Sequence, residues 1–406
     1  MLPLCGAMPL RVRNPGKRAL RRAGWCERGI ICYFCTVAGI YFHIPFCRRI
    51  CTYCDFPRSA DLRPMRPLLD AMHRELDARA DALRGASVRT LYFGGGTPSL
   101  CAPGELQELV THARSLFGFG RAEEITVECN PDDLTGEYVA RLRDTEIDRV
   151  SVGVQSFDDA CLRMMNRRHT AAAAVEAVRR LRRAGFANLT VDLIYGVPGF
   201  GGESLRRSLG MALSLEAEHL SAYHLTIEPG TVLGRRMAEG RFAPVAEETS
   251  EREFACVHDT LTAAGYEHYE VSNFARPGRR ARHNASYWTG EPYLGIGPGA
   301  HSFDGAERRW CEPGVAEYVA GPRYGSERLT ERDRANETVM TALRTADGLD
   351  TEAFGARYGA ARLARTMAAA QPFLKSGALC SEGGRLRIPA ERFLLSDAVI
   401  AALFDA

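Results

Sequence analysis

The chain has 406 residues, a length that predicts two domains with room for an appendage. Its hydrophobic content of 46% and charged content of 25% are ordinary for a globular protein. A net charge of +2 argues against a broad nucleic-acid surface and against a strongly basic membrane patch.

The 13 cysteines are scattered and odd in number, unlike the disulfide framework of a secreted protein. We therefore expect reduced thiols and a cytoplasmic protein. Residues 1–36 read as an N-terminal extension whose first acid is Glu27. The lack of acidic residues before Glu27 is a charge bias typical of a transit or signal peptide. We nevertheless favour a start of translation near Val37. The apolar run of residues 29–42 is shorter than the roughly 18–20 residues of a membrane span, so no transmembrane segment is expected.

An apolar stretch, residues 39–44, is followed by three cysteines in the spacing C-x₃-C-x₂-C, namely Cys47, Cys51 and Cys54. Each iron of a [4Fe–4S] cluster needs a ligand, so three thiolates hold three irons and leave the fourth open for chemistry. A zinc ribbon is the alternative, because Cys32 and Cys35 add a second C-x₂-C pair with suitable spacing. Zinc would leave Cys47 unused, so the loop favours the cluster.

Six short β-rich runs recur along the chain, each followed by an amphipathic helical pattern. The predicted strands are residues 40–44, 90–93, 125–128, 149–154, 189–194 and 219–227. The predicted helices are residues 68–83, 105–117, 136–142, 171–184 and 203–215. This alternation indicates a parallel sheet with crossover helices. It predicts an α/β fold, a partial (β/α)₆ barrel over residues 37–264.

Each predicted strand ends in a cluster of Gly, Pro or polar residues: HIPFC, GGGTPS, ECNP, GVQS, YGVPG and HLTIEPG. In β/α barrels the active site is built from the loops at the carboxyl ends of the strands. All six loops therefore face one mouth, and the cysteine loop is among them.

Several residues of these loops are candidates for ligand binding, each with a plain structural alternative. The glycine run at residues 94–96 allows close backbone approach to an ammonium group, or is only a tight turn. Glu128 can accept hydrogen bonds from a sugar hydroxyl, or is only a capped loop carboxylate. Gln155 is expected at the same mouth. Arg167 and Arg168 suit a carboxylate, or are solvated.

Asp192 lies in the otherwise apolar strand VDLIYG, and a buried carboxylate must be paired or hydrogen-bonded. After residue 264 the pattern changes, and residues 265–310 extend the barrel with a strand at 266–274 and the motif HNASYW at 283–288. Residues 311–334 read as a linker. Residues 335–406 predict a small C-terminal helical, winged-helix-like domain that packs on the barrel or on a partner rather than on DNA.

The ordered motifs identify a family. The chain resembles the radical-SAM superfamily, in its coproporphyrinogen III oxidase-like branch, through these segments: YFHIPFCRRICTYCDF, LYFGGGTPS, ECNPDDL, SVGVQSF, MNRRHT, DLIYGVPG and HLTIEPGT. The resemblance implies a [4Fe–4S] cluster on the three cysteines and bound S-adenosylmethionine. It also implies the residues around these cofactors, which are Tyr41, Gly95, Gly96, Thr97, Glu128, Gln155, Arg167, Asp192 and Ile194. In particular it assigns the glycines to the methionyl amine, Arg167 to the carboxylate and Glu128 to the ribose side.

Two functions remain open within that branch. Coproporphyrinogen III oxidases carry a further cysteine where this chain has Phe56, and an N-terminal stretch that residues 1–36 do not resemble. Phe56 and HNASYW instead resemble the heme chaperones of the HemW type, which deliver heme to membrane respiratory enzymes. That resemblance implies His283 as a heme ligand, with His301 and His224 as second choices. It leaves open a homodimer and peripheral membrane association, and predicts no oxidase activity.

Overall fold

The computed structural model describes residues 36–405. Cys32, Cys35 and nearly all of the predicted extension therefore lie outside the described residues. The frame is a 12-stranded sheet in the order β12-β11-β10-β9-β1-β2-β3-β4-β5-β6-β8-β7. Its centre is six parallel strands: β1 (Thr36–Ile44), β2 (Ala86–Gly95), β3 (Glu124–Cys129), β4 (Arg149–Gln155), β5 (Leu189–Tyr195) and β6 (His219–His224).

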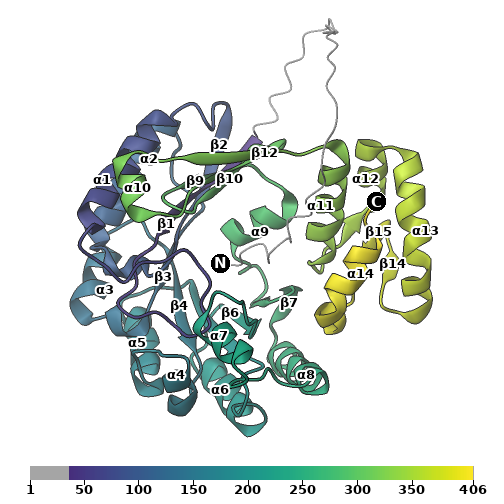
Figure 1. Cartoon of the computed structure of the whole chain (residues 1–406), viewed down its shortest axis with the longest axis horizontal. Helices are drawn as coiled ribbons and strands as arrows, with labels where there is room; N and C mark the ends of the chain where they lie inside the picture. The colour runs from purple at the N-terminus through teal and green to yellow at the C-terminus, as the bar shows by residue number, and fades with distance from the viewer. Residues whose placement is uncertain (1–35, 406) are drawn as a thin grey trace, which may run out of the picture.

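Helices cover the outer face of these strands (Figure 1). They are α1 (Met65–Ala78), α2 (Pro103–Phe117), α3 (Gly136–Arg143), α4 (Asp159–Met164), α5 (Ala171–Arg183) and α6 (Glu203–Ser214). The arrangement confirms the predicted partial (β/α)₆ barrel. Successive side chains of a strand point to opposite faces, so Ile40 and Phe42 join the core under the helices while Tyr41 belongs to a separate inner cluster with Tyr92.

Both edges of the barrel are extended. At one edge β9 (Tyr293–Ile296) runs parallel to β1, followed by three antiparallel strands, β10 (His301–Phe303), β11 (Glu307–Cys311) and β12 (Tyr324–Arg328). At the other edge lie β8 (Asn273–Ala275) and β7 (Glu267–Glu270). The helix α9 (Arg282–Thr289) packs against β1 and β2 and sits on the open side of the sheet (Figure 1).

Two sequence predictions differ from the structure in this region. The single strand expected at residues 266–274 is the hairpin β7–β8, because no Gly or Pro marks the turn between the two halves. The segment expected as a linker, residues 311–334, contains α10 (Val315–Ala320), β12 and the start of the next helix. Strand β12 is mostly exposed at the sheet edge, so its sequence lacks the apolar alternation of a strand. Helices α7 (Val232–Ala238) and α8 (Glu247–Ala263) were also not predicted.

The C-terminal part lies to one side of the barrel (Figure 1). It comprises α11 (Glu331–Leu343), β13 (Leu349–Asp350), α12 (Thr351–Tyr358), α13 (Ala360–Ser376), β14 (Cys380–Glu382), β15 (Arg385–Arg387) and α14 (Ser396–Ala402), with a separate three-stranded sheet. Helices and a hairpin in this order confirm the winged-helix-like fold. Phe393 packs edge-on against His268 of β7, with ring centroids 5.1 Å apart, and so joins the two parts.

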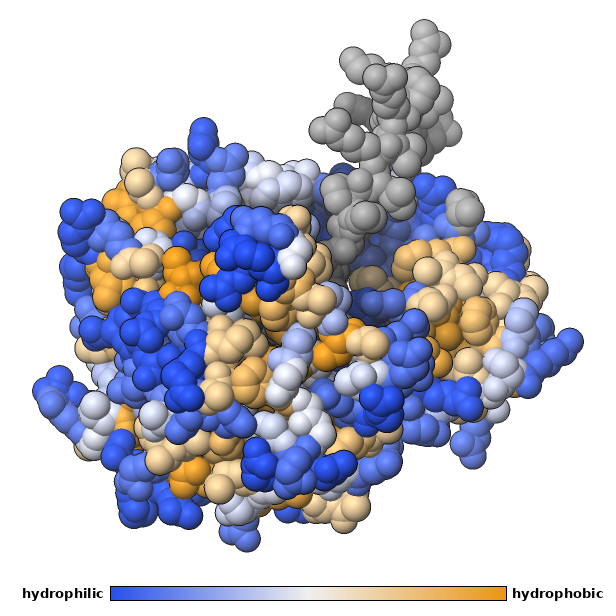
Figure 2. Space-filling model, turned by 60° about the horizontal axis from the view of Figure 1, so that its bottom comes forward, coloured by the Kyte–Doolittle hydropathy of each residue, from blue (hydrophilic) through white to orange (hydrophobic). Residues whose placement is uncertain are grey.

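The surface is mixed. Figure 2 shows hydrophilic side chains over much of the visible face, with apolar patches on the barrel and a broader weakly apolar area on the C-terminal part. Among residues 36–405 no helix combines the length and the apolar character that a membrane crossing requires.

Candidate functional site

The three motif cysteines lie in the loop that leaves β1 at the mouth of the barrel, and all three thiols are half-buried. The loop is fixed from the segment after α4. The backbone N–H of Thr52 donates to the carbonyl of Met165 (3.1 Å), and the side chain of Asn166 donates to the carbonyl of Ile50 (2.7 Å). Burial raises the pKa of Cys47, and that of Cys54 to about 11. Both are therefore thiols until a metal displaces the proton.

Arg167 connects this loop to the rest of the mouth. Its Nη1 donates to Sγ of Cys51 (3.3 Å), and its Nη2 donates to Oδ1 of Asn130 (2.6 Å) and to the carbonyl of Gly153 (2.5 Å). Its Nε is buried and has no partner among the described residues. The neighbouring Arg168 is instead bound to Asp132 and Asp133. Of these two neighbouring arginines, Arg167 is therefore the one placed to serve a ligand beside the cysteines.

Thr97 completes a chain of contacts between two of the cysteines. Its Oγ1 donates to Sγ of Cys47 (3.5 Å) and accepts a bond from Nδ2 of Asn130 (3.3 Å). Asn130 therefore joins Thr97 to Arg167, a role that the sequence analysis did not assign. The spacing of Asn130 and Glu128 could have predicted this role, because residues two apart in extended backbone lie on the same side of the chain.

Glu128 lies beside the glycine run at the end of β2. Its Oε1 accepts a bond from the Tyr92 hydroxyl (2.7 Å), and its Oε2 accepts one from the Gly95 N–H (3.1 Å). Gly95 has φ 108°, and a Cβ there would lie 2.6 Å from the His43 ring. A Cβ on Gly96 would lie 2.7 Å from the Phe46 carbonyl oxygen, within the segment leading to the cysteines. Close packing against that segment therefore requires glycine at both positions.

Gln155, Asp192 and Ile194 line up on the neighbouring strands. Gln155 has φ 69° at a bulge of β4, a strained conformation that is concentrated at functional sites. Asp192 accepts a bond from Ser151 Oγ (2.9 Å), and burial raises its pKa. Ile194 packs in an apolar cluster that includes Tyr53 of the cysteine loop. The Asp192 carboxylate is thus hydrogen-bonded, as we expected for a carboxylate in an apolar strand.

Tyr41 is connected to the cysteine loop by hydrogen bonds through His43. Its hydroxyl lies 3.2 Å from Nδ1 of His43, whose Nε2 lies 3.1 Å from the carbonyl oxygen of Pro57. Burial raises the pKa of Tyr41 and lowers that of His43, so both groups are neutral at physiological pH. Phe56 is half-buried, and its carbonyl accepts a bond from Arg58 (2.8 Å).

His283 is buried deep inside the fold, away from the mouth. The side chain is 0% exposed, with Nδ1 2.8 Å from Thr90 Oγ1 and Nε2 2.9 Å from the Tyr287 hydroxyl. Its ring stacks on that of Tyr92 at 5.1 Å, and burial lowers its pKa to about 3. Both ring nitrogens are thus engaged in side-chain hydrogen bonds in this structure, and the role of His283 as a heme ligand stays a prediction.

The second-choice histidines differ from each other. His301 on β10 is exposed and stacks near Trp310, with ring centroids 6.2 Å apart. His224 at the end of β6 is hydrogen-bonded through Nε2 to Ser250 Oγ (2.9 Å). Neither lies beside the HNASYW helix in the described contacts. A cavity of about 690 Å³ does lie against that helix, and Tyr287 and Trp288 form part of its wall.

The mouth suits the cofactors that the motifs implied. It offers three thiols on one loop, an arginine whose buried Nε has no partner within residues 36–405, and glycines with no room for a side chain. Thiolates are the ligands of iron–sulfur clusters, and a guanidinium binds a carboxylate. Cys47, Cys51 and Cys54 would hold the cluster, which when bound supplies an iron with an open coordination position.

Comparisons with known proteins agree with this geometry. Residues 41–212 match the radical SAM superfamily, and residues 329–395 match the HemN C-terminal domain. The chain is 37% identical over 376 residues to the heme chaperone HemW of Mycobacterium tuberculosis, covering 90% of this chain and 94% of that protein. It is 34% identical to the Bacillus subtilis heme chaperone HemW over 327 residues, covering 79% and 86%.

A solved structure shows the same fold. Coproporphyrinogen III oxidase (HemN) from Escherichia coli superposes with a TM-score of 0.78 at 22% identity, covering 91% of this chain and 90% of that one. At that identity the match establishes the fold alone. The sequence relationship to the Mycobacterium tuberculosis chaperone, which covers 90% of this chain and 94% of that protein, is the more specific. This chain therefore belongs to the radical-SAM superfamily and, within it, to the HemW family.

Proposed function

We propose that this protein is a heme chaperone, which binds heme in the cytoplasm and passes it to respiratory proteins during transient contact with the membrane. The observation that carries the proposal is the position of the HNASYW helix, which supplies Tyr287 and Trp288 to the wall of a 690 Å³ cavity. Small-molecule sites span roughly 300–1,000 Å³, so the cavity is of suitable size. The names of the relatives support the same ligand.

The mouth of the barrel has the second role in this proposal. The three cysteines bind a [4Fe–4S] cluster, and Arg167 binds the carboxylate of S-adenosylmethionine. Gly95 and Gly96 receive the methionyl amine, and Glu128 and Gln155 the ribose side, while Asp192 and Ile194 line the adenosyl pocket. Tyr92 links the two regions, since its hydroxyl bonds to Glu128 and its ring stacks on His283.

Coproporphyrinogen III oxidase activity is the alternative function, supported by the likeness in fold to the Escherichia coli oxidase. Phe56 is evidence against it, because the oxidases have a further cysteine at this place in the motif. Phenylalanine offers no thiolate, so chemistry that uses that cysteine is unavailable to this chain.

One anaerobic experiment separates the two functions. The full chain is reconstituted with iron and sulfide, heme is added, and the Soret absorbance is followed. In parallel, loss of carboxyl groups from coproporphyrinogen III is assayed with S-adenosylmethionine and a reductant. We expect a stoichiometric Soret band and no decarboxylation. Decarboxylation without stable heme binding would overturn the proposal.

A matched variant tests the cluster separately. The triple substitution C47A/C51A/C54A removes all three thiols at the mouth and leaves the HNASYW cavity unchanged. We expect this variant to lose iron and sulfide while it still binds heme, since the two sites use different residues. Thermal unfolding of both proteins serves as the control for folding.

A further inference from the structure

A cleft separates the barrel from the C-terminal part, and its two walls differ in chemistry. The barrel wall is aromatic, with the side chains Tyr287, Trp288, Tyr293 and Phe303 from α9, β9 and β10. The opposite wall comes from α11, α12 and β15 and is rich in arginine. Flat apolar rings on one side and cations on the other suit a ligand that is itself flat and bears carboxylates.

The charges in the cleft are unbalanced. Six arginines line it, namely Arg280, Arg308, Arg334, Arg357, Arg385 and Arg387, against four carboxylates, Glu291, Glu337, Asp347 and Asp350. The lining therefore carries an excess of two positive charges. A porphyrin with two propionates carries two negative charges, so the excess matches it.

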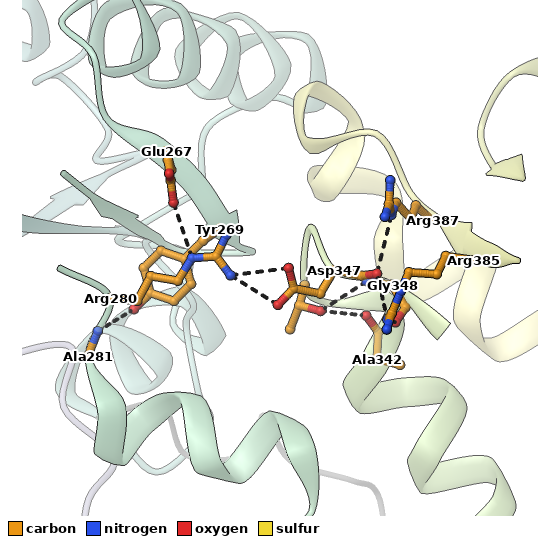
Figure 3. Close-up of polar contacts among 10 residues, drawn as sticks. Glu267, Tyr269, Arg280, Ala281, Ala342, Asp347, Gly348, Arg385 and Arg387 are labelled. Carbon is orange, nitrogen blue, oxygen red and sulfur yellow. Dashed lines mark hydrogen bonds and ion pairs between the residues drawn. The ribbon is translucent and has the colours of Figure 1, made fainter. Parts of the chain in front are cut away.

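Three of the arginines are committed to the fold. Arg280 binds Asp347 (3.0 Å) and Glu267 (3.3 Å) and so ties the barrel to the C-terminal part (Figure 3). Arg385 and Arg387 both donate to the backbone carbonyl of Asp347 (3.3 Å each) (Figure 3). These three hold the walls together.

The other three arginines form fewer ion pairs and side-chain hydrogen bonds with the described residues. Arg334 has no ion pair or side-chain hydrogen bond with any described residue. Arg357 is exposed and lies over the Tyr358 ring (5.1 Å to its centroid), and Tyr358 donates to the Arg334 carbonyl (3.2 Å). Arg308 binds Glu337 (2.8 Å), but its Nε is buried and lacks a partner among the described residues. Arg334 and Arg357 both line the cleft, and neither guanidinium has an ion pair with a described residue.

We propose that this cleft is the heme site, in which Arg334 and Arg357 bind the two propionates while Tyr287 and Trp288 contact the macrocycle. The proposal rests on the proposed function and adds to it the place, the orientation and the residues that select a dicarboxylate. His283 is then a positioning residue, because its Nε2 holds the Tyr287 hydroxyl from behind (2.9 Å).

Heme titration of substituted full-length protein tests the assignment. Arg334→Ala and Arg357→Ala each remove charge-assisted hydrogen bonds, which are worth about 1.5–3 kcal/mol, or roughly tenfold or more in affinity. We expect each variant to bind heme at least about tenfold more weakly, and the double variant weaker still. The matched control is Arg141→Ala on α3, whose exposed guanidinium pairs with Glu137 outside the cleft. It should bind heme like the wild type.

Changing the ligand completes a thermodynamic cycle. Heme dimethyl ester lacks the carboxylates, so the wild type should bind the ester about as weakly as the double variant binds heme. The substitutions should then have no further effect on ester binding. If ester and heme bind alike, or if the double variant keeps wild-type affinity for heme, the cleft assignment is wrong although heme binding stands. If the wild type binds neither, the proposed function itself fails.

Trp288 gives a local reading of the same event. The chain has three tryptophans, and of the two among residues 36–405, Trp288 and Trp310, Trp288 lines the cleft. Heme bound there should quench its fluorescence, and Trp288→Phe should remove most of the quenched signal when the two proteins are compared at equal fractional Soret change. Quenching unaltered by that substitution would place the heme elsewhere. Thermal unfolding confirms that each variant is folded.

Discussion

Arg167 donates through Nη1 to the sulfur of Cys51 and through Nη2 to Oδ1 of Asn130, at 3.3 Å and 2.6 Å. One guanidinium thus contacts both the cysteine loop and the end of β3. Its Nε is buried and has no partner among the described residues. A ligand that binds Arg167 at the mouth is therefore coupled to the cysteine loop through this one side chain.

We predict that Arg167→Lys weakens binding of S-adenosylmethionine by about tenfold or more, measured by calorimetry on the reconstituted protein. Lysine keeps the charge but has a single ammonium group, so it cannot make the planar, two-pronged contact of arginine. Arg168→Lys is the control, because Arg168 is bound to Asp132 and Asp133 instead. Equal losses in the two variants would show that general charge matters rather than the position of Arg167.

Gly96→Ala should loosen the cysteine loop. The new Cβ would lie 2.7 Å from the Phe46 oxygen and from the Pro45 carbonyl carbon. Overpacking of this kind costs about 1–3 kcal/mol, so we expect that loss in the free energy of unfolding and a lower iron content after reconstitution. Gly104→Ala on α2 has nothing within 4 Å and should leave stability unchanged or raise it by up to about 1 kcal/mol. Full iron content in Gly96→Ala would contradict the argument.

The sequence was sufficient for the barrel and for the mouth. Alternating strand and helix patterns fixed six parallel strands, and the carboxyl ends of such strands share one edge, so the cysteine loop and Glu128 were expected at the same site. The partners of these residues were harder to foresee. Ser151 meets Asp192 only through the register of β4 on β5, and Gln155 has a positive φ that arises at a bulge in that pairing.

The position of His283 could not be predicted, because a polar motif on a short helix does not reveal which neighbour covers it. In the fold α9 packs on β1 and β2, and Thr90 comes from a strand nearly 200 residues earlier in the chain. The cleft was hidden for the same reason. Arg334 and Trp288 are far apart in sequence and line one cavity only because the C-terminal part lies beside α9.

Glu270 should make stability depend on pH. It is 0% exposed at the end of β7, and burial raises its pKa to about 8, above the ordinary 4.5 of the unfolded chain. The folded state therefore binds more protons than the unfolded state between these values, so this group's stabilising contribution is complete below pH 4.5 and is lost as pH rises towards and through 8. We expect Glu270→Gln to raise the melting temperature relative to wild type at pH 8 more than at pH 5.

The same comparison with Glu267→Gln isolates the effect of burial. Glu267 lies on the same strand but is exposed and paired with Arg280. Its substitution should change the melting temperature little, and by a similar amount at both pH values, since exposed ion pairs contribute about 0–1 kcal/mol. A difference between the pH values as large as that of Glu270→Gln would show that some other group titrates.

Two threonines on neighbouring strands test whether His283 is held by the fold or reserved for a ligand. Thr90→Val keeps the shape of the side chain but removes the partner of Nδ1, and a buried nitrogen left without its bond costs about 1–3 kcal/mol. Thr126 is equally buried, yet its Oγ1 has no partner among the described residues, so Thr126→Val should be neutral or stabilising. Urea denaturation measures both. If Thr90→Val is as stable as wild type, the hydrogen bond to His283 contributes nothing to the fold, and the imidazole is free for another role.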